Sequence, residues 1–413
     1  MRFWLRIHFR RVFVSGTDKV PATGPVILAC NHPNSFLDAI VVALLLKRPV
    51  NFLVRSDVFR KPAARWILGK LKMIPIYRLQ EGVENLEKNQ GTFKLCTDIL
   101  SRGEVLLIFS EGNCVLEKRL RSLKKGTARI VFGAEESKQW NLHVNVVPVG
   151  INYAKPTLFR TELMVSFGNK FTATDLKETF EAETAKAIRL FNERLSPAML
   201  NELLIIPEKE QDYPAETALE LGRTIFRYPV FFHKFNDGER LRTEQKWLKK
   251  LFQSNTVESS VSFSQFGEKT EKINIPLKAS VPYLWKGNML IVILGFPLAA
   301  AGFIIHLVPT LLTRNISKKT DRSPKFRSSV VFGAGALFSY VWYLILTLVI
   351  ALINYRLLPV ILLFPWLGWI ALIWWEALQQ RRRRIQYHLF KRAAPAAFEN
   401  WIDERDELLG MLH

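Results

Sequence analysis

Two residues near the amino terminus have the types and the spacing of a proton-transfer pair. His32 follows an apolar run at Val26–Cys30 that predicts a buried strand, and Pro33–Ser35 form a polar corner before a predicted helix at Phe36–Leu46. Asp38 falls in the first turn of that helix, close enough to reach the imidazole. A histidine oriented by a carboxylate is a general base. The alternative is a turn histidine beside an aspartate that only favours the helix dipole.

Other predicted strands also end in polar residues. The strand at Lys72–Tyr77 ends at Arg78, whose planar fork suits a phosphate or carboxylate unless it is an ordinary surface arginine. The strand at Val105–Phe109 leads into Glu111 and Gly112, a carboxylate beside a permissive backbone. Five basic residues precede Gly126 and a predicted helix: Lys118, Arg119, Arg121, Lys124 and Lys125. They form either a cradle for an anion at the start of the helix or a solvated loop. Pro148 is expected to mark an edge or bend in the strand at Val144–Tyr153.

Taken together, four stretches resemble, in order and spacing, the four blocks of the glycerolipid acyltransferase family: Asn31–Asp38, Ile74–Arg78, Phe109–Gly112 and Val147–Ile151. That family includes 1-acylglycerol-3-phosphate and glycerol-3-phosphate acyltransferases, and the resemblance covers about residues 1–175. It implies an α/β fold, a mixed sheet flanked by helices, followed here by a C-terminal α-helical membrane region.

The sequence departs from the common family pattern at three points. Five residues separate His32 from Asp38 where four are usual, a spacing similar to glycerol-3-phosphate or dihydroxyacetone-phosphate acyltransferases with C-terminal membrane segments. Ser110 replaces a proline, and Asn113 stands where threonine is common. The carboxylates remain, but the choice of acceptor stays open.

The resemblance implies a role for each block. His32 would act as general base on an acceptor hydroxyl and Asp38 would hold its tautomer, so that the hydroxyl attacks acyl-CoA or an acyl carrier protein thioester without an acyl-enzyme. Arg78 is expected to bind the acceptor phosphate, with Lys125 as a second ligand. The other substrate-binding candidates are Asn31, Glu111 and Gly112, with Pro148 along the acyl or pantetheine path. No metal and no resident cofactor are expected, because no metal-ligand cluster is visible.

Composition points to a membrane. The 413 residues carry a formal charge of +21, which suits nucleic acid or an anionic membrane surface. Long apolar runs in the C-terminal third favour the membrane and argue against nucleic acid. Three cysteines without metal or disulfide spacing fit a reducing compartment, and no cleavable signal peptide is expected.

The expected domains follow from these patterns. Residues 1–20 form a roughly helical, basic and aromatic segment for a lipid interface, or else an ordinary first helix. The catalytic core then covers residues 21–175, a helical extension residues 176–287, membrane segments residues 288–377, and a basic cytoplasmic tail residues 378–413.

Three apolar runs have the length to span a bilayer: residues 288–312, 330–353 and 357–375. Four tryptophans fit an aromatic belt: Trp366, Trp369, Trp374 and Trp375. Basic residues at 314–327 and 381–384 conflict with three spans from a cytoplasmic enzyme. We therefore predict a re-entrant hairpin at Gly295–Pro297 and two full spans, with three spans as the alternative. The enzyme is expected in the cytoplasmic membrane, with its catalytic domain facing the cytoplasm.

These observations predict a membrane-bound O-acyltransferase of phospholipid synthesis. Lysophosphatidate and glycerol-3-phosphate both remain as acceptors. A lipid esterase or phosphatase would need a nucleophile, for which Ser35 and Cys114 are the nearby candidates. A non-catalytic membrane scaffold is the third possibility.

Overall fold

The computed structural model describes residues 2–59, 62–77, 89–226, 228, 234–253, 256–274, 277, 289–319 and 323–412. The chain divides into two compact units, which are described separately. The first consists of Met1–Ile205 with Lys234–Leu241, and the second of Ile206–His233 with Arg242–His413.

The first unit is built on an eight-stranded mixed sheet with the order β4-β3-β5-β2-β6-β7-β1-β8. The strands are β1 (Phe9–Ser15), β2 (Val26–Cys30), β3 (Val50–Arg55), β4 (Met73–Ile76), β5 (Val105–Phe109), β6 (Asn145–Tyr153), β7 (Thr161–Phe167) and β8 (Lys234–Asn236). All neighbouring pairs are parallel except β6 and β7, which are antiparallel. The carboxyl ends of β2 to β6 therefore meet at one edge of the sheet. The polar residues that follow β2 and β5 in the sequence are thus brought to the same edge.

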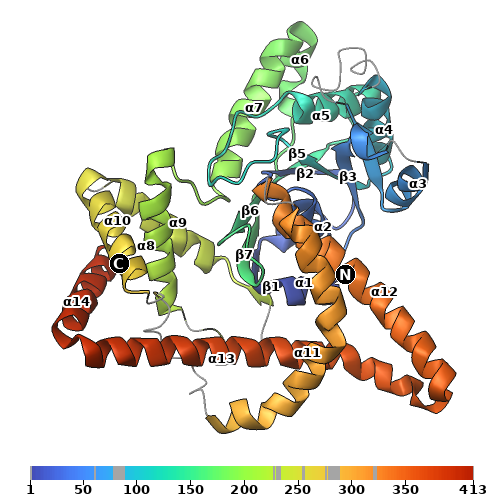
Figure 1. The fold of residues 1–413 in the computed structure, drawn as a ribbon. Helices are drawn as coiled ribbons and strands as arrows, with labels where there is room; N and C mark the ends of the chain where they lie inside the picture. Colours follow the sequence, from blue (N-terminus) through green and yellow to red (C-terminus); the bar gives the residue numbers. More distant parts are fainter. Residues whose placement is uncertain are drawn as a thin grey trace. The chain divides into compact units, whose positions relative to one another are not determined.

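The helices of the first unit are α1 (Arg2–His8), α2 (Phe36–Leu45), α3 (Pro62–Lys70), α4 (Asn89–Ser101), α5 (Gly126–Ser137), α6 (Lys177–Ala182) and α7 (Thr184–Leu200). Figure 1 shows α4, α5 and α7 grouped beside β5, β2 and β3. Their apolar side chains, such as Phe132 of α5, form one core cluster with alternate residues of the strands, such as Ile27 and Leu106. The residues of β2 are buried throughout, as a central parallel strand requires. The predicted mixed sheet flanked by helices is confirmed.

The N-terminal segment differs from its prediction. The α-helix of this segment is limited to Arg2–His8, and Phe9–Ser15 form β1 inside the sheet. Phe9 and Phe13 are 0% and 1% exposed, and the Arg11 guanidinium lies 2.7 Å from the Glu162 carboxylate on β7. A separate interfacial segment over residues 1–20 is therefore wrong, because the aromatic residues of its second half belong to the core.

The first unit also extends further along the chain than the predicted core at residues 21–175. Helix α7 places Phe191, Leu195 and Met199 in the core of the sheet, although these residues lie in the predicted helical extension. Strand β8 then returns from residues 234–236 to pair with β1. The expected boundary at residue 175 is thus wrong. Pro148 was also expected at an edge or bend, but β6 continues through it between β2 and β7, and its carbonyl accepts the Gly168 N–H at 2.8 Å.

The second unit contains a helical bundle and a group of long apolar helices. The bundle has α8 (Asp212–Gly222), α10 (Thr256–Lys272) and α14 (Pro395–Leu412) in mutual contact, with α9 (Glu239–Gln253) contributing Trp247 against Gly222. The Trp401 indole donates to the Thr270 hydroxyl at 3.0 Å, which ties α14 to α10. The predicted tail at residues 378–413 is therefore helical: its first part continues α13 (Phe364–Ala393), and α14 belongs to this bundle.

The apolar helices are α11 (Met289–Lys318), α12 (Arg327–Asn354) and α13 (Phe364–Ala393), with the short helix η10 (Tyr355–Leu363) before α13. Two stretches of the described chain, Val292–Lys318 and Pro324–Ala393, are long and apolar enough to cross a membrane. Only 22% and 11% of their most apolar windows are buried, unlike the core helix of a soluble protein. These features support the prediction of a membrane protein.

The re-entrant hairpin is not present. Helix α11 continues through Gly295, Phe296 and Pro297, so the chain does not reverse there. The Trp374 indole donates to the Val292 carbonyl at 2.7 Å and its ring lies against Phe296. This tryptophan therefore joins α13 to α11, and the aromatic belt stays a prediction.

Gly150 tests the packing that holds β6 in place. A Cβ atom there would overlap the Glu202 carbonyl, so we expect Gly150→Ala to cost about 1–3 kcal/mol in the free energy of unfolding. Gly133→Ala in α5 is the control, because nothing lies within 4 Å of its Cβ position and alanine favours the helix. Thermal unfolding of the detergent-solubilised protein compares the two. Equal midpoints would contradict this packing.

Candidate active site

His32 and Asp38 meet at the carboxyl edge of the sheet. His32 lies two residues beyond the end of β2, and its Nδ1 is 2.9 Å from Oδ2 of Asp38 in the first turn of α2. An ionised carboxylate only accepts hydrogen bonds, so Nδ1 carries the proton and Nε2 keeps its lone pair. The structure thus brings His32 and Asp38 into contact with the tautomer that a general base requires, and the catalytic role of the pair stays a prediction.

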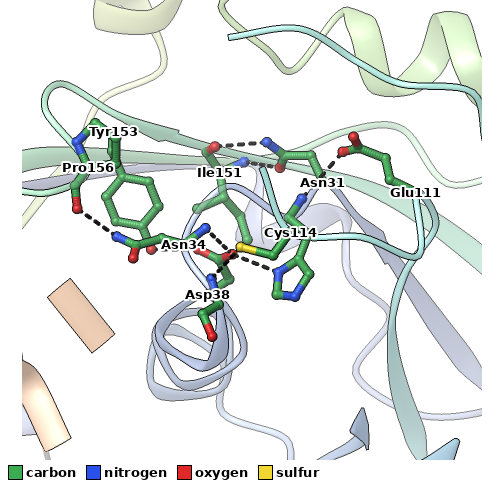
Figure 2. A network of polar contacts seen from close by, with 10 residues as sticks. Asn31, Asn34, Asp38, Glu111, Cys114, Ile151, Tyr153 and Pro156 are labelled. Carbon is green, nitrogen blue, oxygen red and sulfur yellow. Dashed lines mark hydrogen bonds and ion pairs between the residues drawn. The ribbon is translucent and has the colours of Figure 1, made fainter. Parts of the chain in front are cut away.

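Asp38 is completely buried and its carboxylate accepts two further hydrogen bonds (Figure 2). The Asn34 backbone N–H donates to Oδ2 at 2.7 Å, and the Tyr153 hydroxyl donates to Oδ1 at 2.7 Å. Burial, followed by the charge of Asp38, raises the pKa of Tyr153 well above its ordinary value. The phenol therefore stays neutral and remains a donor, so the buried carboxylate is matched by donors as burial requires.

His32 is held on its other sides as well. Its ring stacks on Phe109 with centroids 3.7 Å apart and planes inclined by 12°. Its backbone N–H donates to Oε1 of Glu111 at 3.3 Å, and its carbonyl accepts the Val115 N–H at 3.0 Å. These contacts leave the imidazole with little freedom to turn away from Asp38.

Glu111 organises the loop that follows β5. While Oε1 accepts from His32, Oε2 accepts the Arg121 backbone N–H at 3.3 Å. Burial raises the pKa of Glu111, and the two N–H donors offset part of that effect. Gly112 has φ +72°, and its N–H closes a turn onto the Phe109 carbonyl at 3.0 Å. A side chain at residue 112 would be strained in this conformation.

Ser110 explains one departure from the family pattern. Its backbone N–H donates to the Cys30 carbonyl at 3.1 Å, a bond that a proline could not make. Its hydroxyl lies 3.0 Å from that of Thr127 in the first turn of α5. The serine therefore ties the ends of β2 and β5 to the beginning of α5.

Part of the first unit is similar to a known family. The family described as Acyltransferase matches residues 11–152, which contain His32, Asp38 and Glu111. Residues 11–152 are therefore an acyltransferase-like domain. A chloroplastic 1-acyl-sn-glycerol-3-phosphate acyltransferase of Arabidopsis thaliana is 27% identical over 129 residues, 30% of this chain and 34% of that protein.

Glycerol-3-phosphate O-acyltransferase 1 of Saccharomyces cerevisiae is 22% identical over 248 residues, 39% of this chain and 32% of that protein. The crystal structure of the 1-acyl-sn-glycerophosphate acyltransferase PlsC from Thermotoga maritima has a TM-score of 0.35 and 16% identity, and covers 49% of this chain and 76% of that one. The chain spans about a third of the length of the curated relatives it matches.

The predicted substrate-binding residues of the acyltransferase domain have different settings. Asn31 is buried, and its amide donates to the Ile151 carbonyl at 3.0 Å and accepts the Ile151 N–H at 2.8 Å, so it joins β2 to β6 (Figure 2). Lys125 is exposed immediately before α5, and Pro148 is buried in β6 opposite Ala29. Arg78 lies outside the described residues. Substrate contact by these four residues stays a prediction.

Sequence reasoning missed three contacts of the site. Tyr153 and Asn34 both donate to Asp38, and Phe109 stacks on the imidazole. Cys114, considered only as a nucleophile, accepts the Ser35 N–H at its Sγ at 3.0 Å. Tyr153 could have been noticed as the one phenol that ends the long apolar run of β6. The position of Asn34 depends on the backbone of the corner, which residue type does not reveal.

Glu111→Gln tests the anchoring of the loop. The amide keeps one acceptor oxygen but presents an NH₂ group to the other backbone N–H, so we expect a loss of about 1–3 kcal/mol in the free energy of unfolding. Glu117→Gln is the matched control, because Glu117 makes a partly exposed ion pair with Arg121 worth about 0–1 kcal/mol. Chemical unfolding in detergent distinguishes them, and a loss no greater for residue 111 than for residue 117 would contradict the anchoring role.

Proposed function

We propose that this protein transfers a fatty acyl group from acyl-CoA or acyl carrier protein to a hydroxyl of a glycerol-phosphate acceptor in phospholipid synthesis. The acceptor is 1-acyl-glycerol-3-phosphate or glycerol-3-phosphate, the substrates named by relatives of the acyltransferase domain. The observation that supports this most is the His32–Asp38 pair at the carboxyl edge of the sheet, with Nδ1 bound to the carboxylate.

The reaction needs no nucleophile from the protein and, we propose, no metal or resident cofactor. Nε2 of His32 takes the proton of the acceptor hydroxyl while the hydroxyl oxygen attacks the carbonyl carbon of the thioester. The tetrahedral intermediate collapses, the C–S bond breaks, and the imidazolium returns its proton to the leaving thiolate. General base catalysis of this kind contributes about 10²–10⁴-fold, and orientation of the two substrates about 7–11 kcal/mol.

The acceptor phosphate is assigned to the basic side of the same edge. Arg78 and Lys125 are its proposed ligands, and Glu111 and Gly112 are proposed to shape that subsite. The first turn of α5 lies beside Ser110, and the amino end of a helix favours an anion. Pro148 is the proposed neighbour of the acyl or pantetheine chain, and Asn31 acts through its bonds to Ile151.

We further propose that the protein resides in the cytoplasmic membrane with the acyltransferase domain facing the cytoplasm. The exposed apolar helices support a membrane location, and a lipid product is most easily released at a membrane surface. The proposed partners are therefore membrane lipids, the acyl thioester and the acceptor, and no nucleic acid.

Product analysis tests the proposed function directly. The detergent-solubilised protein is incubated with a long-chain acyl-CoA and either acceptor, and the acylated lipid is measured by mass spectrometry. We expect a product with at least one acceptor and a loss of about 10²–10⁴-fold in His32→Ala. His143→Ala is the control, because His143 is exposed in the loop before β6.

Three results would contradict this function. Thiol release without any acceptor would indicate a thioesterase, and His32→Ala with undiminished transfer would remove the assigned base. Absence of product with both acceptors and both classes of donor would favour a scaffold.

A further inference from the structure

The geometry points to Tyr153 as a positioning residue of the catalytic pair, acting on His32 through the carboxylate of Asp38. This inference rests on the proposed acyl transfer and adds a residue to its machinery. Tyr153 belongs to β6, 115 residues away from Asp38 in the sequence, and its hydroxyl lies 2.7 Å from Oδ1.

The two oxygens of Asp38 have separate partners. Oδ2 accepts from His32 Nδ1 at 2.9 Å and from the Asn34 N–H at 2.7 Å, whereas the Tyr153 hydroxyl is the partner of Oδ1 among the described residues. A carboxylate held at both oxygens cannot rotate about its Cβ–Cγ bond without breaking a hydrogen bond. Tyr153 therefore fixes the plane in which Oδ2 meets the imidazole. Without it, Oδ1 would be a buried charged oxygen with no donor, which is costly.

Strand β6 is anchored on both sides so that Tyr153 reaches this point. The Asn31 amide exchanges two hydrogen bonds with the backbone of Ile151, which fixes β6 against the end of β2. The next residue, Asn152, donates to the Glu202 carbonyl at 2.9 Å and accepts the Leu204 N–H at 2.8 Å. The Tyr153 ring packs at 5.9 Å from the ring of Phe9. The hydroxyl thus has a fixed position before any substrate binds.

The hydroxyl also tunes the pair electrostatically. The other titratable groups that face the pair among the described residues are Cys30, Cys114 and Glu111. Cys30 ends β2, and Glu111 and Cys114 both lie in the loop after β5. Among these three side chains and Tyr153, the Tyr153 hydroxyl is the one that donates a hydrogen bond to Asp38. A donor that shares the negative charge weakens the hold of Asp38 on a protonated imidazole. Removal of the hydroxyl therefore stabilises the protonated imidazole of His32. In that form Nε2 has no lone pair and cannot accept the proton of the acceptor hydroxyl.

The test is Tyr153→Phe, which keeps the ring beside Phe9 and removes only the hydroxyl. We expect kcat to fall about 10- to 100-fold, with KM for the acceptor within about twofold of the wild type. The acid limb of the pH–rate profile should move to higher pH by about half a unit or more. Because the effect passes through Asp38, the same change in an Asp38→Asn background should lower kcat little further.

Phe9→Leu is the matched control, since it alters the packing of the Tyr153 ring without touching the hydrogen bond. It should leave the acid limb in place. An unchanged acid limb in Tyr153→Phe would overturn the inference. An equal fold decrease in kcat in the wild-type and Asp38→Asn backgrounds would overturn it as well. If Asp38→Asn is too slow to measure, the pH–rate profile of Tyr153→Phe is the deciding test. Failure of the proposed function is a different result, in which the wild type shows no acceptor-dependent transfer.

Discussion

The arrangement of this site depends on the burial of one carboxylate. Asp38 is 0% exposed, and an ion removed from water costs several kcal/mol unless donors replace its hydration. The donors come from two segments: the connection between β2 and α2, which supplies His32 and Asn34, and the end of β6. These segments can satisfy the carboxylate only in the native arrangement. The same charge that makes His32 a base therefore fixes the strands around it.

The parallel part of the sheet provides the rest of the geometry. Because β2, β5 and β6 run in the same direction, His32, Glu111 and Tyr153 emerge at one edge. Glu111 then binds the backbone of His32, and Asn31 binds the backbone of Ile151, so neighbouring strand ends are linked by side chains as well as by the ladder. The site lies at the edge where ligands bind in open α/β sheets. Substrate binding can thus be assigned to loops on a rigid support.

Continuity of apolar sequence decided which parts of the fold could be predicted. Strands β2 and β5 are uninterrupted apolar runs with the predicted bounds, and β6 agrees within one residue. The His32–Asp38 contact was predictable because only five residues separate the pair. Strand β1 was not, since its alternating arginines and aromatics also suit an amphipathic helix. The Tyr153–Asp38 contact requires the β2–β6 pairing, which no local pattern shows. Pro297 was misjudged as a break because neighbouring apolar helices can support a proline within a helix.

The central claim is that Asp38 holds His32 with its proton on Nδ1 and its lone pair on Nε2. Long-range ¹⁵N–¹H NMR correlation of the ¹⁵N-histidine-labelled, detergent-solubilised protein measures the tautomer directly. The seven histidines are distinguished by a His32→Gln sample, which removes one set of signals. Above neutral pH the account predicts a protonated, hydrogen-bonded Nδ1 for His32 that loses its low-field proton signal in Asp38→Asn. A proton on Nε2, with a bare Nδ1 facing Asp38, would contradict the account.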